Sequence, residues 1–140
     1  MSAIETIEDA LLAKVVARIS TATTQRGAKA IEDIPVTSLP YAFTASPSIS
    51  SEAVAFEQRV RRTGINVVVV WKRPADATGT GTLRAAVIND LEAIETAIEE
   101  TDPTLAATVK AARVDQMFLD ENPDSPFYVG VIVVVVEERR

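Results

Sequence analysis

The sequence predicts an α+β fold in which a mainly antiparallel four-stranded sheet carries two amphipathic helices on one face. Two segments dense in valine and isoleucine, residues 65–73 and 128–136, predict the central strands, because β-branched side chains favour a pleated surface over a helix. Two other stretches, residues 4–19 and 83–98, place apolar residues at helical spacing. A chain of 140 residues can build one core, so we expect a single domain over residues 1–140.

The first helix is predicted to begin at a capping box made by Ser2 and Glu5 and to run to about Thr21. We expect it to pack on the sheet, because a helix that lies on a membrane surface usually carries Lys and Arg on its polar face. Its apolar stripe consists of Ile4, Ile7, Leu11, Leu12, Val15, Val16 and Ile19.

A polar connection follows over residues 23–39, in which residues 30–36 are expected to form a short helical turn or strand. Residues 40–45 predict a short strand with Pro40 at its first position, where proline is tolerated. Residues 47–52 predict a loop. Residues 56–73 predict one long bent strand with Gly64 at a bulge or bend, because no Asn-Gly or Asp-Gly hairpin signature interrupts them. The apolar half should lie in the core, and the arginine-containing half should project beyond it.

Residues 74–81 predict a flexible loop, and Thr82 is expected to cap a second helix that ends near Thr101. Residues 109–119 then predict a strand, residues 120–126 a turn, and residues 128–136 the closing strand. The inward side of the second helix carries Leu83, Val87, Leu91, Ile94 and Ile98, and its outward side carries Asp90, Glu92, Glu95, Glu99 and Glu100.

Several functional classes are excluded or disfavoured by composition. The chain has no Cys and no His, which excludes disulfides, thiolate nucleophiles, Ser-His-Asp triads and most zinc sites. A net charge of -6 disfavours a general nucleic-acid binder, which needs clustered Lys and Arg. The N-terminus does not read as a signal peptide, and no apolar run approaches the roughly 20 residues of a membrane span. We expect a soluble intracellular protein.

Residues 78–82 are the most enzyme-like feature, because they lie between a strand and a helix, where phosphate-binding loops occur. However, Arg84 stands where the dinucleotide fingerprint has its third glycine, and the Gly-Lys-Ser/Thr sequence is missing. A connector is favoured, and a nucleotide-binding module remains an alternative. The acidic residues 120–124 lack the glycine and terminal glutamate of a calcium loop. The sequence therefore predicts no enzyme, no metal and no cofactor.

Neither valine segment alternates apolar and polar residues, as a strand with one face in water would. Both faces of the sheet should therefore be covered, and the helices cover only one. We predict that neighbouring copies cover the other face. The alternative is that the connection over residues 23–39 and the first helix fold over it within one copy.

The order of elements resembles the tail terminator proteins of long-tailed bacteriophages, also called minor tail or tail completion proteins. The features that carry the likeness are an N-terminal amphipathic helix, a strand Leu39-Pro40-Tyr41-Ala42-Phe43, a long strand ending in Trp71-Lys72-Arg73-Pro74, a second helix and a closing hairpin. The resemblance implies a virion protein, assembled in the host cytoplasm, that forms a ring of six copies. Such a ring caps the tail tube, stops tube polymerisation and presents a surface to the head connector, while DNA passes through without specific binding.

Another neck component, such as a head completion or stopper protein, remains the nearest alternative. The resemblance carries no catalytic residues, no cofactor and no membrane contact. We expect contacts within the ring or with the tube from the charged half-strand and the following loop, namely Glu57, Arg59, Arg61, Arg62, Arg73, Asp76, Thr78 and Thr80.

Overall fold

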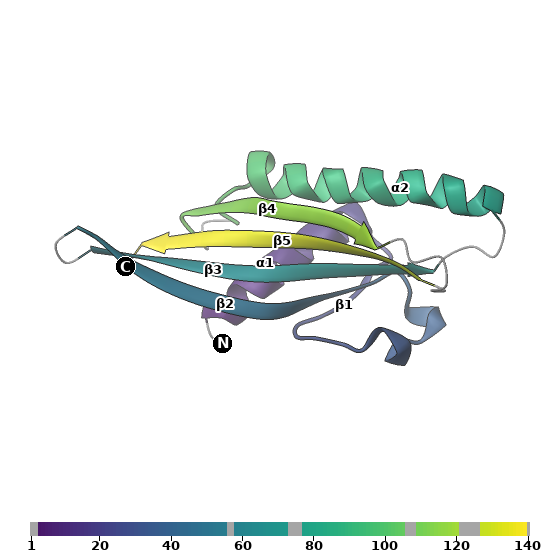
Figure 1. The fold of residues 1–140 in the computed structure, drawn as a ribbon, viewed down its shortest axis with the longest axis horizontal. Helices are drawn as coiled ribbons and strands as arrows, with labels where there is room; N and C mark the ends of the chain where they lie inside the picture. Colours follow the sequence, from purple (N-terminus) through teal and green to yellow (C-terminus); the bar gives the residue numbers. More distant parts are fainter. Residues whose placement is uncertain (1–2, 56–57, 73–76, 106–108, 121–126, 140) are drawn as a thin grey trace.

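A computed structural model describes residues 3–55, 58–72, 77–105, 109–120 and 127–139 (Figure 1). The predicted α+β class is confirmed, with two helices and a mixed, mostly antiparallel sheet. In chain order the elements are α1 (Ala3–Arg18), β1 (Thr23–Gln25), the 3-10 turns η1 (Ile31–Asp33) and η2 (Val36–Ser38), β2 (Tyr41–Ala55), β3 (Gln58–Lys72), α2 (Ala77–Thr96), the π-helix η3 (Ala97–Thr101), β4 (Ala111–Asp120) and β5 (Phe127–Arg139).

The sheet has five strands in the order β1-β2-β3-β5-β4, so the prediction of four strands was wrong by one. The added strand, β1, is three residues long and pairs parallel with β2, while the other pairs are antiparallel. Its sequence Thr-Thr-Gln carries no apolar alternation. Pairing with the edge of β2, rather than local preference, therefore makes it a strand.

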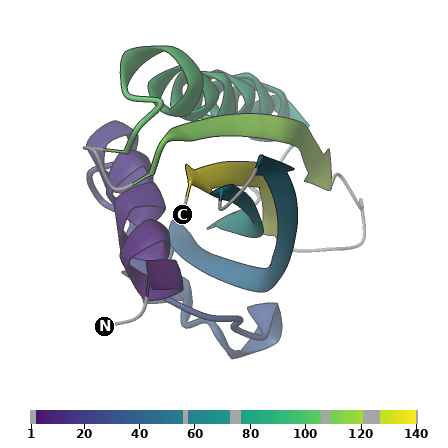
Figure 2. The same cartoon turned by 90° about the vertical axis from the view of Figure 1, so that its left-hand side faces the viewer.

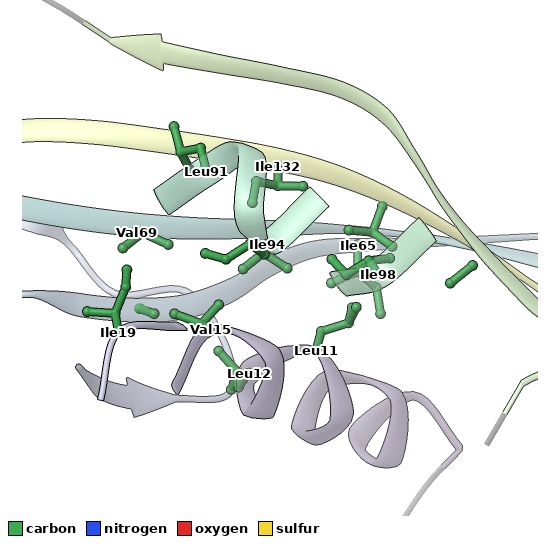
Figure 3. Packing of buried hydrophobic residues seen from close by; sticks show 14 of the residues in the cluster. Leu11, Leu12, Val15, Ile19, Ile65, Val69, Leu91, Ile94, Ile98 and Ile132 are labelled. Atoms are coloured by element: carbon green, nitrogen blue, oxygen red, sulfur yellow. The ribbon is translucent and has the colours of Figure 1, made fainter. Parts of the chain in front are cut away.

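Both α-helices pack on one face of the sheet and form the main core with it, as the apolar stripes predicted (Figures 2 and 3). The placement of Val16 in the stripe of the first helix was wrong, because this residue is exposed. Gly130 of β5 allows a close approach there, because a Cβ atom at this position would lie 2.9 Å from Cδ2 of Leu91 and 3.1 Å from Cζ3 of Trp71. The fully buried members from the helices and the central strands include Ile7, Leu11, Val15, Ile65, Val67, Val69, Val87, Ile94, Ile98, Ile132, Val134 and Val136.

The opposite face of the sheet, called the far face below, carries a second and smaller core. Tyr41 and Phe43 of β2 and Val68 and Val70 of β3 are buried there together with Ile34, which follows η1. Partly buried Ile31 and Leu39, from the same connection, pack against this cluster. The alternative that the connection covers this face within one copy is thus confirmed at this end. The part of that alternative concerning the first helix was wrong, because α1 lies on the other face beside α2.

The long strand predicted through Gly64 is confirmed as β3, but the irregularity beside Gly64 lies in β2. The register shifts between Ala45 and Ser48, and Ser46 has a φ of 53°. A side chain at Gly64 would crowd this bulge, since its Cβ would lie 2.9 Å from Oγ of Ser48.

The loop predicted at residues 47–52 was wrong, because these residues continue β2 and pair with β3. Hydrogen bonding to a long neighbouring strand satisfies their backbone groups and outweighs the low strand preference of serine and proline. The paired ends of β2 and β3, residues 48–55 and 58–63, form a projection that we call the arm (Figure 1).

Helix α2 begins at Ala77, five residues before the predicted cap at Thr82, so the predicted flexible loop was wrong for residues 77–81. Each glycine in a helix costs only about 1 kcal/mol, and extending an existing helix is far easier than starting one. The long apolar stripe after Leu83 can therefore support a weak first turn. The predicted end near Thr101 is confirmed, in the form of the π-helix η3.

Strand β4 contains a register shift between Val114 and Gln116, whereas the sequence predicted regular alternation. The predicted alternation placed Val114 on the same face as Gln116 and Phe118, and this grouping was wrong. The extra residue, Asp115, moves Val114 to the helix-covered face with Met117, opposite Val134 and Ile132 respectively. The predicted turn at residues 120–126 lies, after Asp120, outside the described residues.

Thr44 and Thr63 are both fully buried beneath the helices. Replacing each of them by valine should change the free energy of unfolding in opposite directions. The hydroxyl of Thr63 has no hydrogen-bond partner. The hydroxyl of Thr44 donates to the carboxylate of Glu8 and accepts from the backbone N–H of Gly27 at 3.2 Å. Thr63→Val should therefore raise the free energy of unfolding by about 1 kcal/mol, whereas Thr44→Val should lower it by about 1–3 kcal/mol. Urea unfolding measures both, and a destabilising Thr63→Val would contradict the first expectation.

Candidate assembly surface

The valine-rich strand β5 is fully covered on one face and only partly covered on the other. Tyr128, Ile132, Val134 and Val136 are buried on the helix-covered face. On the far face Val131, Val133 and Val135 are half-buried. Val131 packs against the edge of the second core, whereas Val133 and Val135 lie beyond that cluster. The neighbours of these three valines on β4 in the pairing register are Phe118, Gln116 and Arg113. We call these six residues the open half of the far face.

Phe118 is the most apolar residue that this surface presents to solvent, with 46% of its surface exposed. It lies on an edge strand, since β4 pairs only with β5 within the described chain. On the other side of the sheet, β1 pairs with Tyr41, Ala42 and Phe43 of β2 and leaves the later part of β2 at an edge. Ile49, 52% exposed, lies on that part. Exposed edges and exposed apolar side chains of this kind favour contact with another chain.

The arm carries cross-strand charge pairs between β3 and β5. Arg61 lies opposite Glu138, and Nε of Arg61 is 3.0 Å from Oε2 of Glu138. The side chains are only 13% and 17% exposed, and the two atoms form an ion pair without hydrogen-bond alignment. Removing one partner would leave a largely buried charge, so this pair holds β5 to the arm. Arg61, which the sequence suggested as a contact residue, therefore has its partner within the same chain.

Arg62 points to the far face. A second arginine, Arg113, lies beside it there, and the sequence had not indicated that the two are neighbours. With Arg113 of β4 and Glu137 of β5, Arg62 lines a small hollow of about 60 Å³, which Val135, Ala111 and Ala112 complete. Arg113 was missed because its position next to Arg62 depends on the strand register and on the bulge at Asp115. No local sequence signal reports either feature.

The other predicted contact residues lie apart from this hollow. Arg59 belongs to β3 and pairs in register with Ala53 on the arm. Thr78 and Thr80 lie in the first turns of α2, at the end of the molecule opposite the arm (Figure 1). Glu57, Arg73 and Asp76 lie outside the described residues. Arg59, Arg61 and Arg62 thus follow one another along β3, with Arg61 and Arg62 on opposite faces of the sheet, and the start of α2 lies at the other end of the molecule.

The predicted acidic outer side of α2 is present toward its C-terminal end. Glu92, Glu99 and Glu100 are exposed and Glu95 is half-buried, and no cation of the described chain lies within ion-pair distance of any of them. Asp90, by contrast, accepts a hydrogen bond from Nε of Arg18 at 2.9 Å.

The polar groups between α1 and the connection are satisfied by one another. Arg26 lies 3.4 Å from a carboxylate oxygen of Glu5 and 3.3 Å from one of Asp9, and Glu8 accepts the Thr44 hydroxyl. These contacts fasten the start of the connection to α1. Among the described residues, no three side chains of the His, Cys, Asp or Glu type gather to bind a metal ion. None of the described helices is both long enough and apolar enough to span a membrane.

The fold is similar to that of a chain in the solved virion of a native gene transfer agent particle. The TM-score is 0.57, the sequence identity is 12%, and the match covers 95% of this chain and 94% of that chain. At this identity the likeness establishes the fold. No protein-family model and no curated protein sequence matches the chain.

Proposed function

We propose that this protein is a structural subunit of a phage-like particle and that it acts as a tail terminator. In this role, copies of the chain close into a ring, with six copies as the expected number. The ring caps the finished tail tube, prevents further tube subunits from adding and offers its other side to the head connector. It acts by docking rather than by chemistry, it is assembled in the host cytoplasm, and DNA passes through its centre.

The observation that carries this proposal is the likeness, over nearly the full length of both chains, to a chain of a gene transfer agent virion. The open half of the far face adds physical support. A sheet is most stable when both faces are covered, and burying apolar area contributes about 25 cal/mol per Å². Phe118 and the half-buried valines of β5 would gain this burial from a neighbouring copy.

The proposal is tested by light scattering and negative-stain microscopy of the purified protein, alone and with tube protein added. We expect rings, and we expect Val133→Glu to weaken ring formation by about tenfold or more, because it places a charge in the apolar part of the contact. Val16→Glu is the matched control, since Val16 is also partly exposed but lies on α1.

A wild-type protein that stays monomeric at high concentration, with and without tube protein, would overturn the proposed function. Rings that Val133→Glu leaves intact would instead show that the open half of the far face is not the contact. Binding to the connector but not to the tube would replace the tail terminator with a stopper protein.

A further inference from the structure

We propose that the hollow between Arg62 and Arg113 receives the acidic C-terminal part of α2 from the next copy of the chain. This contact rests on the self-assembly proposed above and identifies the two surfaces that meet. It makes α2 of one copy the cover for the open half of the far face of its neighbour.

The hollow presents cations from two strands that are separated by β5. Arg62 on β3 lies opposite Glu137, and Arg113 on β4 lies opposite Val135. Strands lie about 4.8 Å apart, so cations two strands apart can hold carboxylates from one helix face. The lining of the hollow therefore offers two guanidinium groups to incoming carboxylates.

Of the two arginines, Arg62 already takes part in an interaction of its own, and Arg113 is the one whose present partner can be exchanged. Glu137 is 3.7 Å from Nζ of Lys110, so its charge is shared with that lysine. Arg113 pairs with Asp115 at 2.9 Å, but both side chains are more than half exposed. Exposed pairs of this kind contribute at most about 1 kcal/mol, so Arg113 can exchange or share its partner at little cost.

The acidic end of α2 has the complementary character. Glu92 and Glu95 of α2 and Glu99 of η3, which continues the helix, follow one another at spacings of three and four residues, which places them side by side. Like charges at this spacing repel, and their position near the negative end of the helix dipole adds to the repulsion. No cation of the described chain offsets it. A cationic surface on another copy would turn this unfavourable arrangement into a favourable one.

The two surfaces cannot meet within one copy, and this determines the kind of assembly. Helix α2 lies on the helix-covered face of the sheet (Figure 2). The hollow is lined by Arg62, Val135 and Glu137, which belong to the far face. A contact between two different surfaces of identical chains is heterologous, and such contacts continue from copy to copy until the rotation closes a ring. The same geometry would not produce a two-fold dimer.

Charge reversal on either side tests the contact. We expect Arg62→Glu with Arg113→Glu to weaken assembly about tenfold or more, and Glu92→Lys with Glu95→Lys and Glu99→Lys to do the same. Each variant alone would oppose like charges. An equimolar mixture should regain assembly, because the lysine-bearing helix fits the glutamate-bearing hollow and the two native surfaces still match. Light scattering measures all three samples, and circular dichroism checks that each variant is folded.

Lys72→Glu is the matched control, because Lys72 is an exposed cation at the other end of β3. Variants that assemble like the wild type, or a mixture of folded variants that fails to regain assembly, would overturn the contact while leaving the proposed function intact. A wild type that never assembles would overturn both.

Discussion

Replacing Ile94 by alanine should lower the free energy of unfolding by about 3–4 kcal/mol, because it opens a cavity in the centre of the main core. Ile94 is fully buried in the last turn of α2, among Ile98, Ile65 and Val69 (Figure 3). The helix and the sheet are both anchored around it, so the surroundings can collapse only partly. Urea unfolding followed by the fluorescence of the buried Trp71 measures the change.

Ile88→Ala provides the comparison on the same helix, because Ile88 is only half-buried. Its substitution should cost less than half as much as that of Ile94. Since assembly would add to the measured stability, both variants are compared at a concentration where the chain is monomeric. Equal losses from the two substitutions would contradict the placement of α2 on the sheet.

The helices and long strands could be predicted because their signals are local. Apolar residues at helical spacing identified the buried sides of α1 and α2, and the runs of β-branched residues identified β3 and β5. The start of α2 was missed because glycine and threonine have weak helix preference. The later part of β2 was missed because the pairing with β3, which no local pattern reports, makes it a strand.

The candidate surface was only partly predictable, because it depends on register. The sequence identified Arg62 and the acidic side of α2, but Arg113 and Phe118 reach the far face only because Asp115 forms a bulge. The half-covered state of that face was equally hidden. The connection is polar, and among its described side chains Ile31, Ile34 and Leu39 reach the second core. The prediction that neighbouring copies cover the whole far face was therefore too broad, and the open half is what remains for a partner.

The second large effect is expected where the connection covers the far face of the sheet. Ile34→Ala should lower the free energy of unfolding by about 2–3 kcal/mol, because Ile34 is buried against Val68 and Val70 with the rings of Tyr41 and Phe43 beside it. If the connection is part of the fold of a single copy, this loss appears in the monomer. Hydrogen exchange should also become faster in β1, because that strand and the turns belong to the same connection.

Ile49→Ala removes the same atoms from a side chain that is more than half exposed on the arm, and it should change the stability by no more than about 0.5 kcal/mol. Comparing Ile34→Ala with Ile49→Ala shows whether the connection of the same copy or a neighbouring copy covers this end of the far face. A large effect of Ile34→Ala in the monomer means that each copy closes one end of its far face before it meets a neighbour. A monomer that is indifferent to Ile34→Ala would mean that the connection is held in place only by assembly, and the contact surface would then extend to Val68 and Val70.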